Sequence, residues 1–169
     1  AVALDSTVAD AHTSLGFFHV FYDRDWPAAA VEFARALALD STAAPTWLFR
    51  GWYFVAVDQL DSAAASIRTA ARLDPASPIY ETRLGTVLYM ADTLAAAETA
   101  LAAALRRDPR FAFAHSQLAE VYAEGGQCGK ALAEAVVPGA RSSGALEIEY
   151  AWARGGKAAD ARQFIRKAE

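Results

Sequence analysis

The chain has 169 residues, 54% of them hydrophobic, and carries a formal net charge of −4 at pH 7. That content argues against disorder and suffices to bury a sizeable core. The sequence shows no basic cluster of the kind that nucleic acids need, no apolar run of the ~18 residues that span a membrane, and a single cysteine, Cys128, which excludes an internal disulfide framework.

The first segment, residues 1–6, reads Ala-Val-Ala-Leu-Asp-Ser and closely matches residues 36–41. We interpret residues 1–6 as the tail of a preceding, truncated helical repeat. An end without a polar cap is unusual for a repeat stack. We therefore expect the chain to be part of a larger protein with at least one upstream repeat.

Helical spacing continues along the rest of the chain, because apolar and small residues recur three and four positions apart. About a quarter of the residues are alanine, the strongest helix former. Asp25 before Trp26-Pro27, and Ser77 before Pro78, are typical of helix N-caps. The predicted helices, in chain order, span residues 8–22, 27–39, 44–57, 60–73, 78–91, 94–107, 112–124, 128–137, 143–154 and 157–168.

These helices form pairs that repeat with a period of 34 residues, as the aspartates Asp40, Asp74 and Asp108 show. Three columns of residues follow the same period. The first helix of each pair carries a small residue at Gly16, Gly51, Gly85 and Ala119. The second carries a small residue at Ala29, Ala63, Ala97, Ala131 and Ala161, and four positions later a mostly larger one at Phe33, Ile67, Leu101, Ala135 and Ile165.

The columns resemble the tetratricopeptide repeat family, whose signature is Trp-x-x-Leu-Gly-x-x-Tyr followed by Ala, Phe, Ala and Pro. The second repeat carries this signature at Trp47, Gly51, Phe54, Ala63, Ile67, Ala70 and Pro75. The departures are Arg50 for leucine, Glu81 for tryptophan, one extra residue near 23–25, and a helix cut short at Pro138.

The resemblance covers nearly the whole chain and implies an all-α, right-handed α-solenoid of about five antiparallel helix pairs in a single domain, 1–169. The repeats span approximately 9–41, 44–75, 78–109, 112–138 and 142–169. We expect Gly16, Gly51 and Gly85 to let the two helices of a pair touch backbone to backbone. On this basis Gly51→Leu is predicted to cost about 1–3 kcal/mol through overpacking.

The first helices of this family line a concave groove, and helical phase predicts which side chains enter it here. The aromatic residues among them either anchor a partner or pack against neighbouring repeats, and the sequence leaves both readings open. The predicted groove residues are Thr13, Phe17, Val20, Phe21, Leu48, Phe49, Trp52, Val55, Thr82, Arg83, Thr86, Tyr89, Met90, Phe113, Gln117, Glu120 and Glu124.

Catalytic and metal chemistry find little support in the sequence. Thr13 and Phe17 replace the basic and amide residues with which some relatives grip a C-terminal carboxylate. His12, His19 and His115 fall in columns of packing residues and are expected to pack against the core, not to bind a metal.

Residues 125–130 lack the spacing of a phosphate-binding loop and are predicted to be a turn. Arg50 and Arg83 are expected to meet acidic neighbours or a ligand carboxylate. We predict no cofactor, no metal and no enzymatic activity.

The sequence therefore favours a protein–protein interaction scaffold that binds a peptide or partner domain, as a regulatory module of a larger bacterial signalling protein. The alternatives are a small-ligand sensor and a self-association element that forms homo-oligomers. The expected partners include neither nucleic acid nor membrane. The expected compartment is the cytoplasm, or an extracytoplasmic space if the parent is a membrane-anchored receptor.

Overall fold

A computed structural model describes residues 8–135, 137 and 139 of the chain. Within these residues the regular structure is entirely helical. The predicted helices 143–154 and 157–168, and the tail 1–6, lie outside the described residues. The elements are α1 (Ala9–Phe18), η1 (His19–Asp23), α2 (Trp26–Leu39), α3 (Ala44–Ala56), α4 (Leu60–Leu73), α5 (Pro78–Met90), α6 (Leu94–Arg107), α7 (Ala112–Glu124) and α8 (Cys128–Ala135).

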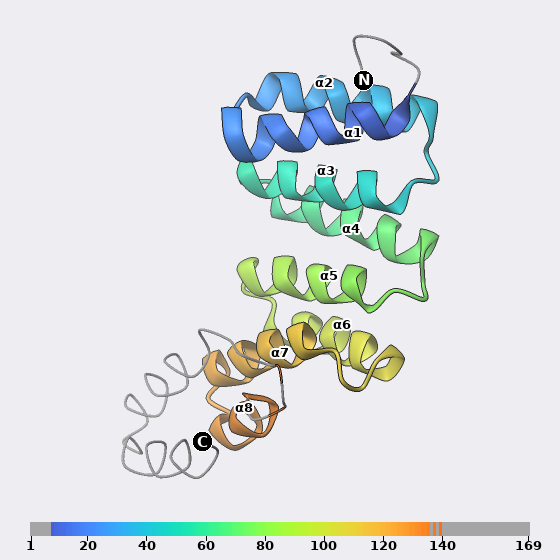
Figure 1. Cartoon of the computed structure of the whole chain (residues 1–169). Coiled ribbons are helices and arrows are strands. Elements are labelled where there is room, and N and C mark those ends of the chain that lie inside the picture. The colour runs from blue at the N-terminus through green and yellow to red at the C-terminus, as the bar shows by residue number, and fades with distance from the viewer. Residues whose placement is uncertain (1–7, 136, 138, 140–169) are drawn as a thin grey trace.

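The helices stack as successive antiparallel hairpins, α1–α2, α3–α4, α5–α6 and α7–α8 (Figure 1). Each first helix contacts the first helix of the next hairpin, as in the pairs α1–α3, α3–α5 and α5–α7. The second helices α2, α4 and α6 each contact the first helix that follows. The second helices lie farther from one another and are bridged by side chains, as Lys130 of α8 pairs with Glu98 of α6 at 3.9 Å. The first helices α1, α3, α5 and α7 therefore build one continuous side of the stack, called here the inner face.

Caps and prolines fix where several helices begin. The Asp25 carboxylate accepts a hydrogen bond from the backbone N–H of Ala28 at 3.0 Å, which confirms the predicted N-cap of α2. Ser77 occupies the N-cap position of α5, as predicted, but its side chain makes no capping hydrogen bond. Pro78 follows it in the first helical turn, where the missing N–H costs nothing.

The turns inside the hairpins repeat with the same period as the sequence. Arg24, Asp58, Asp92 and Gly126 lie 34 residues apart and have positive φ angles of 55°, 58°, 55° and 69°. This left-handed conformation is the common way to end an α-helix. The same backbone geometry therefore recurs in all four described hairpins, although only one of them has glycine at this position.

The extra residue of the first repeat lies in η1, a π-helical turn at residues 19–23. The N–H of Thr93 closes the third hairpin's turn on the carbonyl of Leu88, five residues earlier, at 2.9 Å. In the first hairpin the N–H of Asp25 reaches the carbonyl of His19, six residues earlier, at 3.1 Å. The wider π turn absorbs the insertion before the loop begins, because such a turn holds one more residue than an α-helical turn. The insertion predicted near residues 23–25 thus lies slightly earlier.

The glycines of the first helices receive side chains from the second helices. A Cβ atom added at Gly51 would lie 2.5 Å from Cγ1 of Ile67, and one at Gly85 would lie 2.6 Å from Cγ of Leu101. Ile67 and Leu101 have no exposed surface. The predicted approach of the partner backbone is seen as well, because the Ala63 and Ala97 carbonyl oxygens lie 3.4 Å from the added Cβ positions at Gly51 and Gly85. The closest atoms, however, belong to a large side chain of the partner helix for which each glycine makes room.

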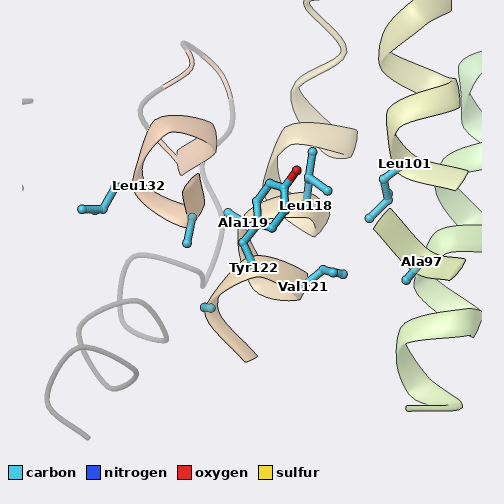
Figure 2. Packing of buried hydrophobic residues seen from close by; sticks show 9 residues of the cluster. Ala97, Leu101, Leu118, Ala119, Val121, Tyr122 and Leu132 are labelled. Atoms are coloured by element: carbon cyan, nitrogen blue, oxygen red, sulfur yellow. The ribbon is translucent and has the colours of Figure 1, made fainter. Parts of the chain in front are cut away.

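The core follows the stack as a row of clusters, and half-buried side chains link some of them, as Leu48 and Leu88 each pack on two clusters. Figure 2 shows its last described section, in which Ala97 and Leu101 of α6 point toward Leu118 and Val121 of α7. Ala131 and Leu132 of α8 complete this cluster. Because α7 buries residues against helices on two sides, removing any hairpin would expose the apolar surface of its neighbours.

Candidate functional site

Four of the predicted groove residues are buried, and two of them join successive first helices of the stack. The Thr13 and Thr46 hydroxyls are 2.7 Å apart and join α1 to α3. Thr86 donates a 2.8 Å hydrogen bond to Oε1 of Gln117 and joins α5 to α7. Val20 lies in the core, and Thr82 bonds a carbonyl of its own helix. The exposed fractions are 6% for Thr13, 5% for Val20, 0% for Thr82 and 9% for Thr86, so their assignment to the groove surface is corrected.

Three further predicted groove residues are half-buried against the core. Leu48 and Val55 of α3 pack on the cluster that contains Ala63 and Ile67. Tyr89 of α5 packs on the next cluster, around Leu101. These three side chains lie between the core and the inner face, and only part of their surface is exposed.

Aromatic rings gather on the inner face where α1 and α3 meet. The ring centroid of Phe17 lies 4.5 Å from that of Phe21 and 5.0 Å from that of Phe49, within the usual range for aromatic pairs. Phe21 remains 49% exposed, while Phe17 and Phe49 are half-buried. These three residues form the aromatic cluster, an apolar surface of the kind that anchors partners.

Beyond the aromatic cluster, an arginine lies between two rings. The guanidinium carbon of Arg83 lies 5.4 Å from the ring centroid of Trp52 and 4.5 Å from that of Phe113. Trp52, Arg83 and Phe113 belong to the successive first helices α3, α5 and α7, and together they form the arginine sandwich. Because the guanidinium is partly desolvated, the pKa of Arg83 is lowered from its ordinary value, yet arginine stays charged at neutral pH.

Both arginines singled out from the sequence contact rings in place of acids. Arg50 lies 5.3 Å from the ring centroid of Trp47 and 5.0 Å from that of Phe54. Neither Arg50 nor Arg83 belongs to an ion pair with any residue that the structure describes. The expected acidic neighbours are therefore absent from this part of the chain. Cation–π contacts hold both guanidinium groups instead.

The other end of the inner face is polar. Gln117 donates from Nε2 to the Glu120 carboxylate at 2.9 Å while its Oε1 accepts from Thr86. Met90 and Glu124 are exposed at the ends of α5 and α7. The inner face thus changes from aromatic at α1 and α3, through the arginine sandwich, to polar and acidic at α7.

The three histidines are buried or half-buried as predicted, but each has a carboxylate partner that sequence reasoning missed. For His19 the partner is Asp23 in the same helical turn, with Nδ1 3.0 Å from Oδ2. Nδ1 of His12, which is 2% exposed, lies 2.6 Å from Oε2 of Glu32 in the paired helix α2. Nδ1 of His115 lies 2.5 Å from Oε2 of Glu134 in α8. Glu32 and Glu134 occupy the same column of the repeat, and that shared column was the signal that would have found the pairs.

Chemical sites are scarce in the described part of the chain. It contains no group of three or more His, Cys, Asp or Glu side chains placed to hold a metal ion. Residues 125–127 form the expected turn between α7 and α8, while residues 128–130, which were included in the predicted turn, already belong to α8. Cys128 begins α8, as predicted. The helices of this part are too short or too polar to cross a membrane.

Comparison with solved structures gives the same architecture. The chain superposes on MamA with a TM-score of 0.74 and 22% identity, covering 95% of this chain and 89% of that one. It superposes on YrrB, described as a TPR protein with an unusual peptide-binding site, with a TM-score of 0.70 and 19% identity, covering 99% and 88%. For PilF of Pseudomonas aeruginosa the values are 0.75 and 20%, covering 95% and 74%. The sequence matches no protein-family model and no curated protein.

Proposed function

We propose that this chain, which has the tetratricopeptide-repeat fold, is a protein–protein interaction scaffold that binds a peptide along its inner face. The observation that carries the proposal is the continuous side built by α1, α3, α5 and α7, with the aromatic cluster and the arginine sandwich in succession. Supporting it, the similar solenoid YrrB is described as having a peptide-binding site.

The aromatic cluster supplies the apolar anchor in this proposal. Phe21 is exposed beside Phe17 and Phe49, so an apolar side chain of a peptide can cover the three rings at once. Burying exposed apolar surface contributes about 25 cal/mol per Å². Rings also lose little conformational entropy when a partner binds, because they have only two side-chain torsions.

The arginine sandwich fixes the orientation of the bound peptide in this proposal. Trp52 and Phe113 hold the Arg83 guanidinium from two sides, so little side-chain entropy remains to be lost on binding. A partly desolvated guanidinium that pairs with none of the described acidic residues favours a carboxylate of the partner. We therefore expect the peptide to carry an apolar residue over α1 and α3 and an acidic residue over α5.

The test is selection from a random peptide library displayed on phage, followed by affinity measurements on the selected peptides. We expect Phe17→Ala combined with Trp52→Ala to weaken binding at least tenfold while the melting temperature is largely kept. Stability lost with affinity retained would show that these rings serve the packing between repeats.

The two arginines provide a matched control for direction. Both are held by two rings, but only Arg83 lies between successive first helices on the inner face. Arg83→Gln is expected to weaken peptides that contain an acidic residue several-fold, and Arg50→Gln is expected to leave them unchanged. Equal losses from both variants would contradict the assigned binding position.

We further propose that the scaffold is a regulatory module of a larger bacterial signalling protein in the cytoplasm. It would have no catalytic activity and would not bind nucleic acid. This role rests on an analogy, because the alanine-rich repeats and the Asp25-Trp26-Pro27 turn are similar to those of repeat regions attached to bacterial signalling proteins. Affinity capture with the full parent protein, with the Phe17→Ala/Trp52→Ala variant as control, tests it. Capture only of proteins unrelated to signalling would exclude this role.

A further inference from the structure

The first helix of the stack carries an apolar seam that the described residues leave uncovered. Val8, Ala11, Leu15, Phe18 and Tyr22 follow one another at steps of three and four residues, so they share one side of the helix. The rings of Phe18 and Tyr22 stack with centroids 5.2 Å apart. Phe18 is 45% exposed, Tyr22 70% and Val8 38%, although all three are large apolar or aromatic side chains.

The equivalent positions of the later repeats are covered by the second helix of the preceding repeat. Val87 and Val121, which correspond to Phe18, are 0% and 3% exposed. Val87 shares a core cluster with Ile67 of α4, and Val121 shares one with Leu101 of α6. Tyr53, the equivalent residue of α3, lies 6.4 Å from Phe33 of α2, ring centroid to ring centroid. In each case the covering residue comes from the same column of a second helix.

From this continuity of the repeat interface we propose that the seam docks an amphipathic α-helix of the same chemistry as α2, α4 and α6. Such a helix carries a small residue, a large apolar residue four positions later and a small residue three positions after that, as Ala29, Phe33 and Ala36 do in α2. The inference is independent of the peptide-binding inner face, because the seam residues belong to other columns.

The spacing of the seam also fits a helical partner. Steps of three and four average 3.5 residues, the spacing with which one helix packs along another. The small residues of the partner would receive the Phe18 and Tyr22 rings, as alanines of the second helices line the core in the later repeats. An extended peptide would match this spacing poorly, since its side chains alternate with a period of two.

The chain itself offers a sharp test. Residues 1–8 repeat residues 36–43 with two substitutions, so a copy of residues 25–35 placed before Ala1 of the full chain recreates the sequence of α2 and its connection to the next helix. If the seam docks such a helix, the melting temperature rises by about 4 °C or more. Protection of the α1 amides against hydrogen exchange rises with it.

Two controls assign the effect to the seam. Phe33→Asp in the added copy alone, or Phe18→Asp in α1, is expected to abolish the rise. Phe21→Asp is the matched control, because Phe21 is 49% exposed on the same segment but lies in the aromatic cluster of the inner face. It is expected to leave the rise intact, and loss of the rise with Phe21→Asp alone would place the added helix on the inner face and overturn the proposal.

The remaining outcomes also decide the matter. No rise in melting temperature, or a rise that survives Phe18→Asp, would overturn the proposal. A concentration-dependent mass of the original chain in sedimentation experiments, abolished by Phe18→Asp and retained by the extended chain, would show that a second copy of this chain occupies the seam. Neither result bears on peptide binding, which is measured with the variants of Phe17 and Trp52.

Discussion

The first and third hairpins share their repeat columns but have different surroundings. In the third, α5 is covered by α4 before it and contacts α7 after it, so Val87 is fully buried. In the first, no described helix precedes α1, and the equivalent Phe18 is 45% exposed. The two hairpins also differ inside, because His12 and Glu32 of the first correspond to Glu81 and Ala100 of the third. The repeat columns of the sequence thus specify each hairpin, and the helices packed before and after the hairpin decide which of its surfaces is buried.

The largest expected effect comes from Glu32→Ala, which gives the first hairpin the residue that the third has at the equivalent position, Ala100. Glu32→Ala leaves His12, only 2% exposed, without its carboxylate partner. We expect a loss of about 3 kcal/mol in the free energy of unfolding, measured by urea denaturation. Glu134→Ala should cost less, because the His115–Glu134 pair is more exposed.

A second substitution sharpens this prediction. Replacing His12 by Leu together with Glu32→Ala is expected to recover most of the lost stability, because an apolar pair needs no ion partner in the core. Recovery would show that the cost came from the buried imidazole of His12 having lost the Glu32 carboxylate. A double variant as unstable as the single one would mean that the cost lies elsewhere in the packing between α1 and α2.

The next largest effect comes from substitutions at the glycine column, which the first and third hairpins share. Gly85→Leu places a side chain where Leu101 already lies, and Gly51→Leu does the same against Ile67. We expect each to cost about 1–3 kcal/mol, measured as a lower urea midpoint. Gly16→Leu should behave alike, since a Cβ there would lie 2.8 Å from the Phe33 ring. Ala96→Leu, on the exposed side of α6, is the control and should change stability little.

The smallest expected effect on stability depends on pH and concerns Tyr122 of α7, the helix that packs on the third hairpin. Burial first, and then the hydrogen bond and charge of Glu98, raise the pKa of Tyr122 to about 12. An unfolded tyrosine titrates near 10, so the neutral phenol stabilises the folded state fully below about pH 10. That contribution is lost as the pH rises toward 12.

Tyr122→Phe should therefore cost about 1 kcal/mol at pH 7, through the lost hydrogen bond to Glu98 at 3.0 Å. It should also flatten the loss of stability between about pH 10 and 12. Denaturation midpoints measured across this range check both effects. Tyr22→Phe is a suitable control, because Tyr22 is 70% exposed. An alkaline transition unchanged by Tyr122→Phe would assign it to other groups.

The sequence by itself determined the fold, because each feature that specifies a hairpin is local. The small and large columns have helical spacing, Asp25 caps its own helix, and the 34-residue period fixes where the chain turns. For this reason the second helices within the described residues, α2, α4, α6 and α8, were predicted to within a residue or two. Even the inserted residue was visible as a break in the period, although only the backbone showed that a π turn absorbs it.

Only the tertiary structure decided which residues of the inner face are surface. Helical phase places Thr13 and Phe17 on the same side of α1, but α3 approaches closely enough to bury Thr13 and leaves Phe17 half-exposed. The ring partners of Arg83 belong to two other repeats. Such outcomes depend on the distance between stacked helices, which is set by the sum of all side chains between them and by no single column of the repeat.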